Sequence, residues 1–179
     1  MVYVFLAPGF EEVEALAPVD ILRRAGAEVR TVGVGGPVIT GAHGIPVQCD
    51  ITAAEAEEKG LEMAILPGGM PGAANLEASA EVQRLLDHCA ANGLWIGAIC
   101  AAPFVLGHKG LLRGRRATCY PGFETEPEGA EYTAALVEQD GRYITGKGPG
   151  AALEFGFRLA EALRGREIAA KLREAMQCR

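Results

Sequence analysis

Short apolar runs and amphipathic segments alternate along the chain, and this alternation predicts its secondary structure. Continuous apolar runs at residues 2–6, 63–66 and 94–99 are typical of buried strands. Residues 28–34 alternate between apolar and polar side chains, which predicts another strand. A helix is expected over residues 11–25, directly ahead of a glycine that can end it.

The rest of the chain continues this pattern. A hairpin-like excursion is expected over residues 37–50, where two short β-like pieces flank a glycine-containing loop. Strands separated by helices indicate one α/β domain, residues 1–179, with a doubly wound, mostly parallel sheet and helices on both faces. Further helices are expected at residues 52–59, 79–91, 101–107, 150–163 and 167–176, and short strands near Ala117, near Leu136 and at residues 143–145.

Composition narrows the class of protein. Hydrophobic residues make up 49% of the chain, which is enough for a buried core and excludes a disordered protein. A net charge of -6 and only 6% aromatic residues argue against nucleic acid or an anionic membrane as partner. The uncharged stretch 94–107 is too short to span a bilayer, and the N-terminus lacks a signal-peptide pattern. Cysteines without CxxC spacing favour free thiols, so we expect a cytoplasmic protein.

Residues 97–103, Gly-Ala-Ile-Cys-Ala-Ala-Pro, place a cysteine where a buried strand turns into a helix. The small neighbours allow a tight elbow that presents the side chain at the carboxyl edge of the sheet. Amides at the start of the following helix lower the pKa of a thiol, so Cys100 is a candidate thiolate nucleophile. The alternative is a buried structural cysteine, since free cysteine is among the most buried residue types.

Residues 66–72, Leu-Pro-Gly-Gly-Met-Pro-Gly, form a loop after another predicted strand. In a doubly wound sheet, this loop lies at the same carboxyl edge as the cysteine. Its glycines allow backbone amides to point into a pocket, so Gly69 N–H and Ala101 N–H are candidates for an oxyanion hole. Gly68 and Met70 are candidates for the pocket wall. The alternative is a tight turn without a chemical role; no Gly-Lys-Ser/Thr follows, which excludes a phosphate loop.

Glu14 differs from the other acidic residues at the start of the first predicted helix. A solvated first turn that complements the helix dipole explains Glu11 and Glu12. Glu14 instead lies among apolar residues, and Pro18 leaves its carbonyl without an amide partner. A glutamate buried beside Cys100 would have a raised pKa, and its protonated carboxyl would donate a hydrogen bond to the thiolate.

The three histidines do not provide the base of a cysteine protease or glutaminase triad. His43, His88 and His108 all precede the C-terminal third of the chain, and none is next to Cys100 in the sequence. They are also too scattered to indicate a metal site. His43, in a glycine-rich loop, is either a pocket residue or an ordinary loop residue. Tyr120 is a candidate pocket wall, and packing of its ring against the core is the alternative.

Four motifs follow one another in the order Glu-Glu-Val-Glu, Leu-Pro-Gly-Gly, Ala-Ile-Cys-Ala-Ala-Pro and Gly-Pro-Gly. Together they resemble the ThiJ/PfpI superfamily, and most closely its parkinsonism-associated protein deglycase (glyoxalase III-like) clade. The resemblance covers essentially the whole chain. It implies a flavodoxin-like, class I glutamine amidotransferase-like fold, a homodimer, and a nucleophile-elbow cysteine that works without a cofactor.

The resemblance also assigns roles to particular residues. The reactive cysteine of the family and its protonated partner glutamate fall on Cys100 and Glu14. Its two backbone donors fall on Gly69 and Ala101. All four positions coincide with the candidates that the residue types and spacing already indicate.

The sequence departs from the clade at positions around the expected pocket. Tyr120 stands where the clade often has a histidine, and His43 where it often has an arginine. Ala102 replaces a frequent glycine. The first two changes alter the polar groups near the substrate but leave the pair of cysteine and glutamate in place.

Two classes of function follow from these features. The first is an enzyme that converts dicarbonyls such as methylglyoxal or glyoxal to a hydroxyacid, or acts on early glycation adducts of proteins, through Cys100 and Glu14. The second is a redox-sensing stress-response protein or chaperone in which Cys100 is oxidised to a sulfinate. A peptidase or amidotransferase is a third and weaker interpretation, because the histidine base is missing. We expect no cofactor or metal, and no nucleic-acid or membrane partner.

Overall fold

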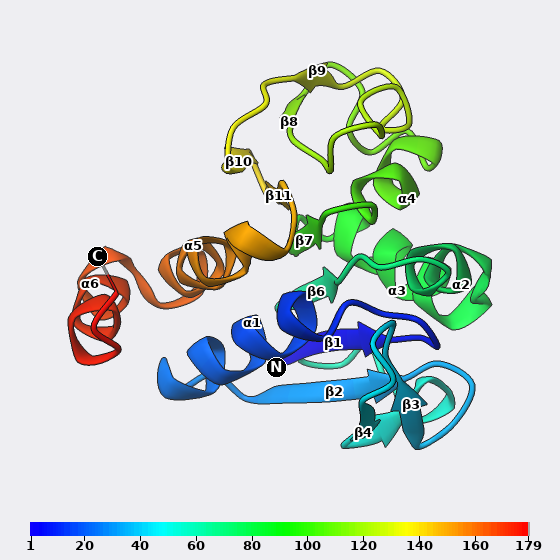
Figure 1. The fold of residues 1–179 in the computed structure, drawn as a ribbon, viewed down its shortest axis with the longest axis horizontal. Coiled ribbons are helices and arrows are strands. Elements are labelled where there is room, and N and C mark those ends of the chain that lie inside the picture. Colours follow the sequence, from blue (N-terminus) through cyan, green and yellow to red (C-terminus); the bar gives the residue numbers. More distant parts are fainter. Residues whose placement is uncertain (179) are drawn as a thin grey trace.

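A central sheet organises the computed structural model, which describes residues 1–178 (Figure 1). Its strands are β1 (Val2–Leu6), β2 (Val29–Gly33), β5 (Ile51–Thr52), β6 (Met63–Leu66), β7 (Trp95–Ile99), β10 (Val137–Asp140) and β11 (Tyr143–Gly146). They lie in the order β10-β11-β7-β6-β1-β2-β5, and every neighbouring pair is parallel except β10 with β11. Two short pairs lie outside this sheet: β3 (Val38–Thr40) with β4 (Pro46–Gln48), and β8 (Arg116–Ala117) with β9 (Glu131–Tyr132).

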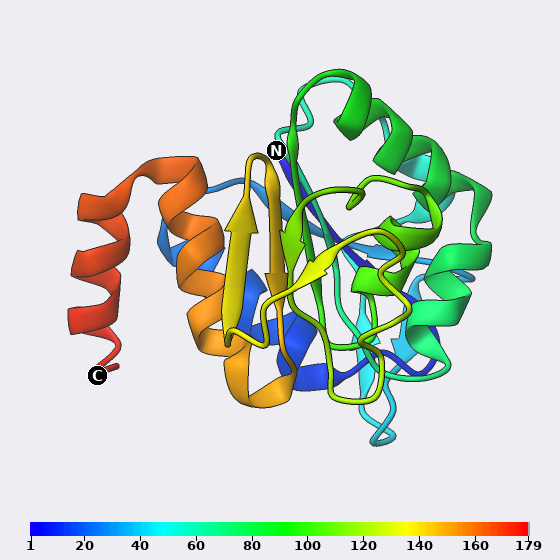
Figure 2. The ribbon, with the colours of Figure 1, turned by 90° about the horizontal axis from the view of Figure 1, so that it is seen from above.

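Helices connect the strands and cover both faces of the sheet. They are α1 (Glu12–Arg24), α2 (Gly72–Ala78), α3 (Ala80–Ala91), α4 (Pro103–His108), α5 (Ala152–Arg164) and α6 (Arg166–Ala175), with the short 3₁₀ helices η1 (Ala53–Glu55) and η2 (Pro149–Ala151). Figure 2 shows α5 and α6 (orange to red) on one side of the strands and the green helices on the other. Within residues 1–178, no helix has the length and apolar character needed to cross a membrane.

The strand order fixes where a site can form. The parallel strands β2-β1-β6-β7-β11 follow the order 2-1-3-4-5 when numbered along the chain, which is the flavodoxin-like order. The predicted fold class, a doubly wound α/β fold with helices on both faces, is therefore confirmed. In such sheets, ligands bind beyond the carboxyl ends of the strands, near the point where the strand order reverses. Here that point lies between β1 and β6.

Alternate residues of each buried strand enter separate cores on the two faces of the sheet. On β1, Tyr3 and Phe5 join the core beneath α2, α3 and α4, while Val4 joins the core beneath α1 and α5. This two-residue period explains why the strand is a continuous apolar run, since both of its faces are covered. The same double burial holds for β6 and β7, so all three strands are rigid supports for the loops that follow them.

Four elements differ from the sequence-based expectation, and one of them is β5, which was not expected as a strand. The helix expected over residues 52–59 is wrong: the chain forms only η1, because the Thr52 and Glu55 side chains close a single capped turn after β5. Helix α2 was not expected, because its first residues belong to a Pro-Gly segment that is typical of a turn. Strand β9 was not expected either, and it is only two residues long. The predicted hairpin is confirmed as β3 and β4.

Candidate active site

Cys100 lies at a sharp elbow between β7 and α4. Its backbone φ is +64°, a left-handed conformation that non-glycine residues rarely adopt. The elbow is held on both sides, because Cys100 N–H donates to Gly146 O at 2.9 Å and Cys100 O accepts from Tyr120 N–H at 2.9 Å. Strain of this kind persists where the surrounding structure enforces it and is concentrated at functional sites. The predicted elbow is therefore present, and its side chain is 9% exposed.

Glu14 lies beside this cysteine, on the first turns of α1. Its side chain is completely buried, and its Oε2 accepts a hydrogen bond of 2.9 Å from Gly68 N–H. A Cβ at position 68 would come within 2.6 Å of the Cys100 Cβ and 2.7 Å of the Glu14 carboxylate, so only glycine allows this approach. Glu14 Oε1 is buried and makes no hydrogen bond of ordinary geometry within residues 1–178. The structure thus brings together the pair of residues that the sequence indicated.

The two side chains affect each other's ionisation. Burial raises the pKa of Glu14 to about 7. Burial and the adjacent Glu14 carboxylate raise the pKa of Cys100 to about 12, while the amides of Gly69 and Ala101, which point at the sulfur, act to lower it. The sequence analysis expected the amides to lower the Cys100 pKa. This expectation is wrong, because burial raises the pKa by more than the amides lower it. Because the groups face each other, they titrate as a pair that keeps one proton between the two pKa values.

The raised Glu14 pKa predicts a stability that falls as the pH rises. The folded protein keeps a proton that the unfolded chain, with an ordinary glutamate pKa of 4.5, has already released. Stability from this group is therefore fully present below about pH 4.5 and is lost as the pH rises through about 7. The difference between a pKa of 4.5 and a pKa of about 7 corresponds to about 3 kcal/mol. Urea unfolding across this range is expected to show the loss in the wild type but not in Glu14→Gln; parallel curves would contradict it.

Glu12 has a role that the sequence did not indicate. It is 5% exposed rather than solvated, and its Oε1 accepts from His43 N–H at 2.9 Å and from Ile45 N–H at 3.4 Å. It thereby fastens the loop between β3 and β4 to the start of α1. The expectation of a solvated Glu12 is wrong because its partners are contributed by a loop about thirty residues away in the chain. The sequence feature that could have indicated this contact is the glycine-containing loop, because its backbone amides are free to donate to a carboxylate.

His43 pairs with acidic residues in this loop. Its Nδ1 lies 2.9 Å from Glu12 Oε2 and 3.5 Å from Glu11 Oε2, and these carboxylates raise the pKa of His43. The three side chains could each offer one ligand atom to a metal ion, with the atoms within 4.8 Å of one another. The sequence did not indicate this group of possible ligands, because His43 is far from Glu11 and Glu12 along the chain. Glu12 already accepts two loop amides, so its carboxylate is committed to the fold, and the role of His43 in a pocket stays a prediction.

Two other predicted pocket residues, Met70 and Tyr120, are exposed. Met70 is exposed in the loop after β6 and lines none of the cavities described here. Tyr120 lines an open pocket of about 220 Å³ next to the elbow, and its ring covers Gly148. Tyr120 therefore lines a pocket, but its role and that of Met70 at the active site stay predictions.

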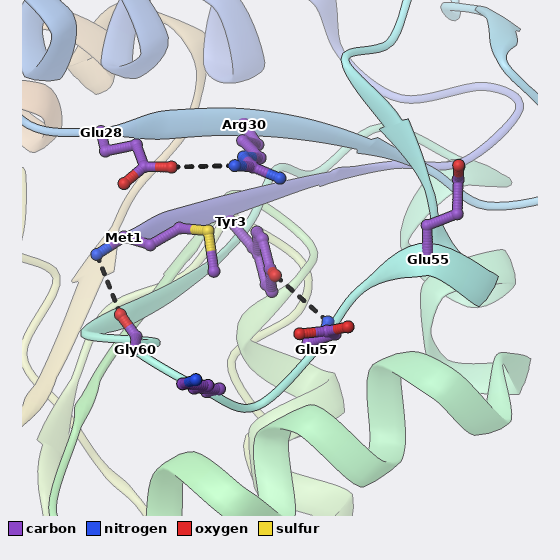
Figure 3. Close-up of a pocket in the computed structure, with 8 residues that line it drawn as sticks. Met1, Tyr3, Glu28, Arg30, Glu55, Glu57 and Gly60 are labelled. Carbon is purple, nitrogen blue, oxygen red and sulfur yellow. Dashed lines mark hydrogen bonds and ion pairs between the residues drawn. The ribbon is translucent and has the colours of Figure 1, made fainter.

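A separate cavity of about 470 Å³ lies at the opposite end of the sheet (Figure 3). Met1 and Tyr3 line it at the amino end of β1, and charged side chains surround it. Some of these groups already have partners: Arg30 pairs with Glu28 at 3.0 Å, and the Met1 ammonium donates to a backbone carbonyl. None of the predicted site residues lines this cavity, and it lies away from the carboxyl edge where ligands of such sheets bind.

Comparisons with known proteins place this chain in a family. Residues 1–162 match the model of the DJ-1/PfpI family. The chain is 37% identical to the Parkinson disease protein 7 homolog of Danio rerio, across 95% of this chain and 93% of the relative. It is 35% identical to the glutathione-independent glyoxalase DJR-1.2 of Caenorhabditis elegans, across 88% of this chain and 84% of the relative. Among solved structures, oxidized Toxoplasma gondii DJ-1 superposes with a TM-score of 0.95 at 34% identity, covering 99% of this chain and 97% of that one.

The resemblance seen in the motifs is thus confirmed along almost the whole chain. The family model and the relatives match this chain in sequence, and the solved structure matches its overall fold. The chain belongs to the DJ-1/PfpI family, within its DJ-1 clade.

Proposed function

We propose that the protein is a cofactor-independent cysteine enzyme that converts reactive dicarbonyls such as methylglyoxal and glyoxal to hydroxyacids. By the same chemistry it would act on early glycation adducts of proteins, as a deglycase. The observation that carries the proposal is the strained elbow at Cys100 with Glu14 and two backbone amides directed at one point. The glyoxalase named among the relatives supports the substrate class.

The proposed reaction starts with addition of the Cys100 sulfur to the aldehyde carbon. The hemithioacetal oxygen would be stabilised by the amides of Gly69 and Ala101, which already point at the sulfur. Glu14 would then carry the former aldehyde proton to the neighbouring carbon, so that the ketone becomes an alcohol and the aldehyde carbon becomes a thioester. Water would cleave the thioester to release the hydroxyacid and the thiol. One carbon is oxidised and the next is reduced, so no external oxidant or cofactor is needed.

The reactive state of this proposal has the shared proton on Glu14 and the charge on the sulfur. Two amides act on the sulfur, whereas one amide, from Gly68, donates to the carboxyl group. Glu14 Oε1 lies buried without an ordinary hydrogen bond among the described residues. A charged carboxylate with a bare buried oxygen is unfavourable, and a neutral carboxyl group that donates to the sulfur removes this cost.

Product formation tests the proposal directly. The purified wild type is expected to form lactate from methylglyoxal without added glutathione, and Cys100→Ala is expected to lose at least about a hundredfold of this activity, since the covalent route requires the sulfur. Cys119→Ala is a matched control, because it also removes a buried free thiol but leaves Cys100 in place. Equal lactate production by the wild type and Cys100→Ala would remove the proposal.

A redox-sensing or chaperone role is the second candidate. The solved relative from Toxoplasma gondii is described as oxidized, and a sulfinate at Cys100 would accept hydrogen bonds from the surrounding donors. Mass spectrometry after mild peroxide separates the candidates. Oxidation of Cys49, Cys119 or Cys178 before Cys100 would leave the sensor role without a basis. A peptidase or amidotransferase is not proposed, because His43, His88 and His108 pair with Glu12, Glu58 and Glu77 and none is recorded in contact with the sulfur.

We also propose that the protein works as a homodimer in the cytoplasm. Val13 and Leu16 support the dimer, since these large apolar side chains lie three residues apart on α1 and are 52% and 37% exposed. The five free thiols support a reducing compartment. Both statements extend the family resemblance to this chain.

A further inference from the structure

An open, almost entirely apolar pocket of about 220 Å³ lies beside the elbow. Backbone hydrogen bonds join its walls to both sides of Cys100. The cysteine donates to Gly146 O, directly before the pocket segment 147–151, and accepts from the N–H of Tyr120, which forms another wall. The pocket is therefore built on the same backbone that holds the nucleophile, and its position relative to the elbow is fixed.

Large apolar side chains flank this pocket although they face solvent. Tyr120 is 45% exposed and Leu136 is 52% exposed, and Pro121, Pro149 and Ala151 complete the apolar lining. A Cβ on Gly148 would come within 3.0 Å of the Tyr120 ring, so the glycine lets the ring lie directly on the backbone. An aromatic ring held this way offers a rigid flat wall, and an apolar ligand laid against it would remove these exposed surfaces from water.

Lys147 is the one charged residue of the lining, and its ammonium group has partners outside the pocket. Its Nζ lies 3.4 Å from the carbonyl oxygen of Ala134, and its charge acts on the Glu124 carboxylate. The remaining lining offers carbon to a ligand. The group that fits is therefore uncharged and apolar. Its size is limited by the volume, and a cavity of about 150 Å³ lined by apolar side chains already binds benzene.

We propose that this pocket binds the non-reacting substituent of an α-oxoaldehyde whose aldehyde carbon is attacked by Cys100. The inference rests on the proposed function and names its substrate class: α-oxoaldehydes with an aromatic or branched apolar substituent, rather than methylglyoxal alone. Methylglyoxal carries only a methyl group and leaves most of the pocket empty. Tyr120 and Leu136 are then specificity-determining residues for this chain.

The test compares kcat/KM for phenylglyoxal and methylglyoxal in three proteins. Leu136→Ala removes one pocket wall, and Leu153→Ala is the matched control because Leu153 is a similarly exposed leucine, 48% exposed, on α5 outside the pocket. Leu136→Ala is expected to lose about fivefold to tenfold on phenylglyoxal and less than about twofold on methylglyoxal. Leu153→Ala is expected to change neither. An unchanged ratio of the two substrates in Leu136→Ala would overturn the inference.

Variants of the aromatic wall give a second measurement. Tyr120→Phe keeps the flat ring and is expected to keep the preference for phenylglyoxal, whereas Tyr120→Ala is expected to lower the phenylglyoxal to methylglyoxal ratio by about tenfold. If the hydroxyl group rather than the ring carries the effect, Tyr120→Phe would lose the preference as well. That result would contradict an apolar subsite.

A binding measurement separates failure of the subsite from failure of the enzyme. Acetophenone resembles phenylglyoxal without its reactive aldehyde, so its binding to Cys100→Ser can be followed by NMR of the pocket residues without any turnover. Binding at Tyr120 that weakens at least fivefold in Leu136→Ala would support the pocket even if both dicarbonyls proved to be poor substrates. Methylglyoxal turnover without acetophenone binding would retain the proposed function and overturn the subsite.

Discussion

Glu14→Gln is expected to lower kcat/KM for methylglyoxal by about 10²- to 10⁴-fold, the range over which a positioned proton carrier contributes. Glutamine has nearly the same shape, and its amide oxygen can still accept from Gly68 N–H, a bond of 2.9 Å in the wild type. It cannot take up and release the proton that moves between the two carbons of the substrate. The loss would therefore report on proton transfer rather than on a rearranged site, and steady-state kinetics with a structure of the variant would measure it.

Glu12→Gln is the matched control for this prediction. Glu12 is another buried glutamate of α1, but its contacts are to the loop amides of His43 and Ile45 rather than to the cysteine. Its replacement is expected to lower the free energy of unfolding by about 1–3 kcal/mol and to change kcat/KM far less than Glu14→Gln does. Equal activity losses in the two variants would mean that Glu14 acts only through the packing of α1.

Gly69→Ala is expected to damage both stability and catalysis. Gly69 has a φ of +83°, and a Cβ there would lie 2.5 Å from Glu11 N and from Gly9 O, which are backbone atoms that cannot move aside locally. Adopting this φ costs alanine about 1–2 kcal/mol before the collisions are counted, so a loss of at least about 2 kcal/mol in unfolding free energy is expected. The displaced amide would no longer stabilise the oxyanion, which costs about 10²- to 10³-fold in kcat.

Gly110→Ala isolates the effect of backbone strain from that of the site. Gly110 has a comparable φ of +73°, but a Cβ there meets nothing within 4 Å. This variant is expected to lose about 1–2 kcal/mol of stability and no activity. Denaturant unfolding and methylglyoxal kinetics of both variants provide the comparison. A Gly69→Ala protein as active as Gly110→Ala would show that the amide of residue 69 has no part in the reaction.

The sheet and the elbow could be predicted because local sequence determines them. Strands β1, β6 and β7 are buried on both faces, so their apolar runs are uninterrupted and easily recognised. The elbow at Cys100 follows from a buried strand that ends among small residues, and the structure shows that its backbone is left-handed. By contrast, the helix expected over residues 52–59 is not formed. Ile51 pairs with Val32 in the sheet, and the Thr52 cap closes only a short 3₁₀ turn.

The environment of the site was harder to predict because distant residues create it. The burial of Glu12 depends on loop amides that α1 meets only in the folded chain. The raised pKa of Cys100 depends on burial beneath neighbouring elements, which the local motif does not report. The sequence therefore indicates which residues meet at the site, whereas the free energy of ionising them depends on tertiary packing.

The ionisation of Cys100 tests the central claim most directly. Ultraviolet absorbance of the thiolate, taken as the difference between the wild type and Cys100→Ala, follows this one sulfur across the pH range. We predict that the thiolate is present at neutral pH, well below the pKa of about 12 that burial and a charged Glu14 give the sulfur, because Glu14 keeps the shared proton. A thiolate that forms only near a pKa of about 12 would place the proton on the sulfur throughout the neutral range, and the proposed nucleophile would not exist.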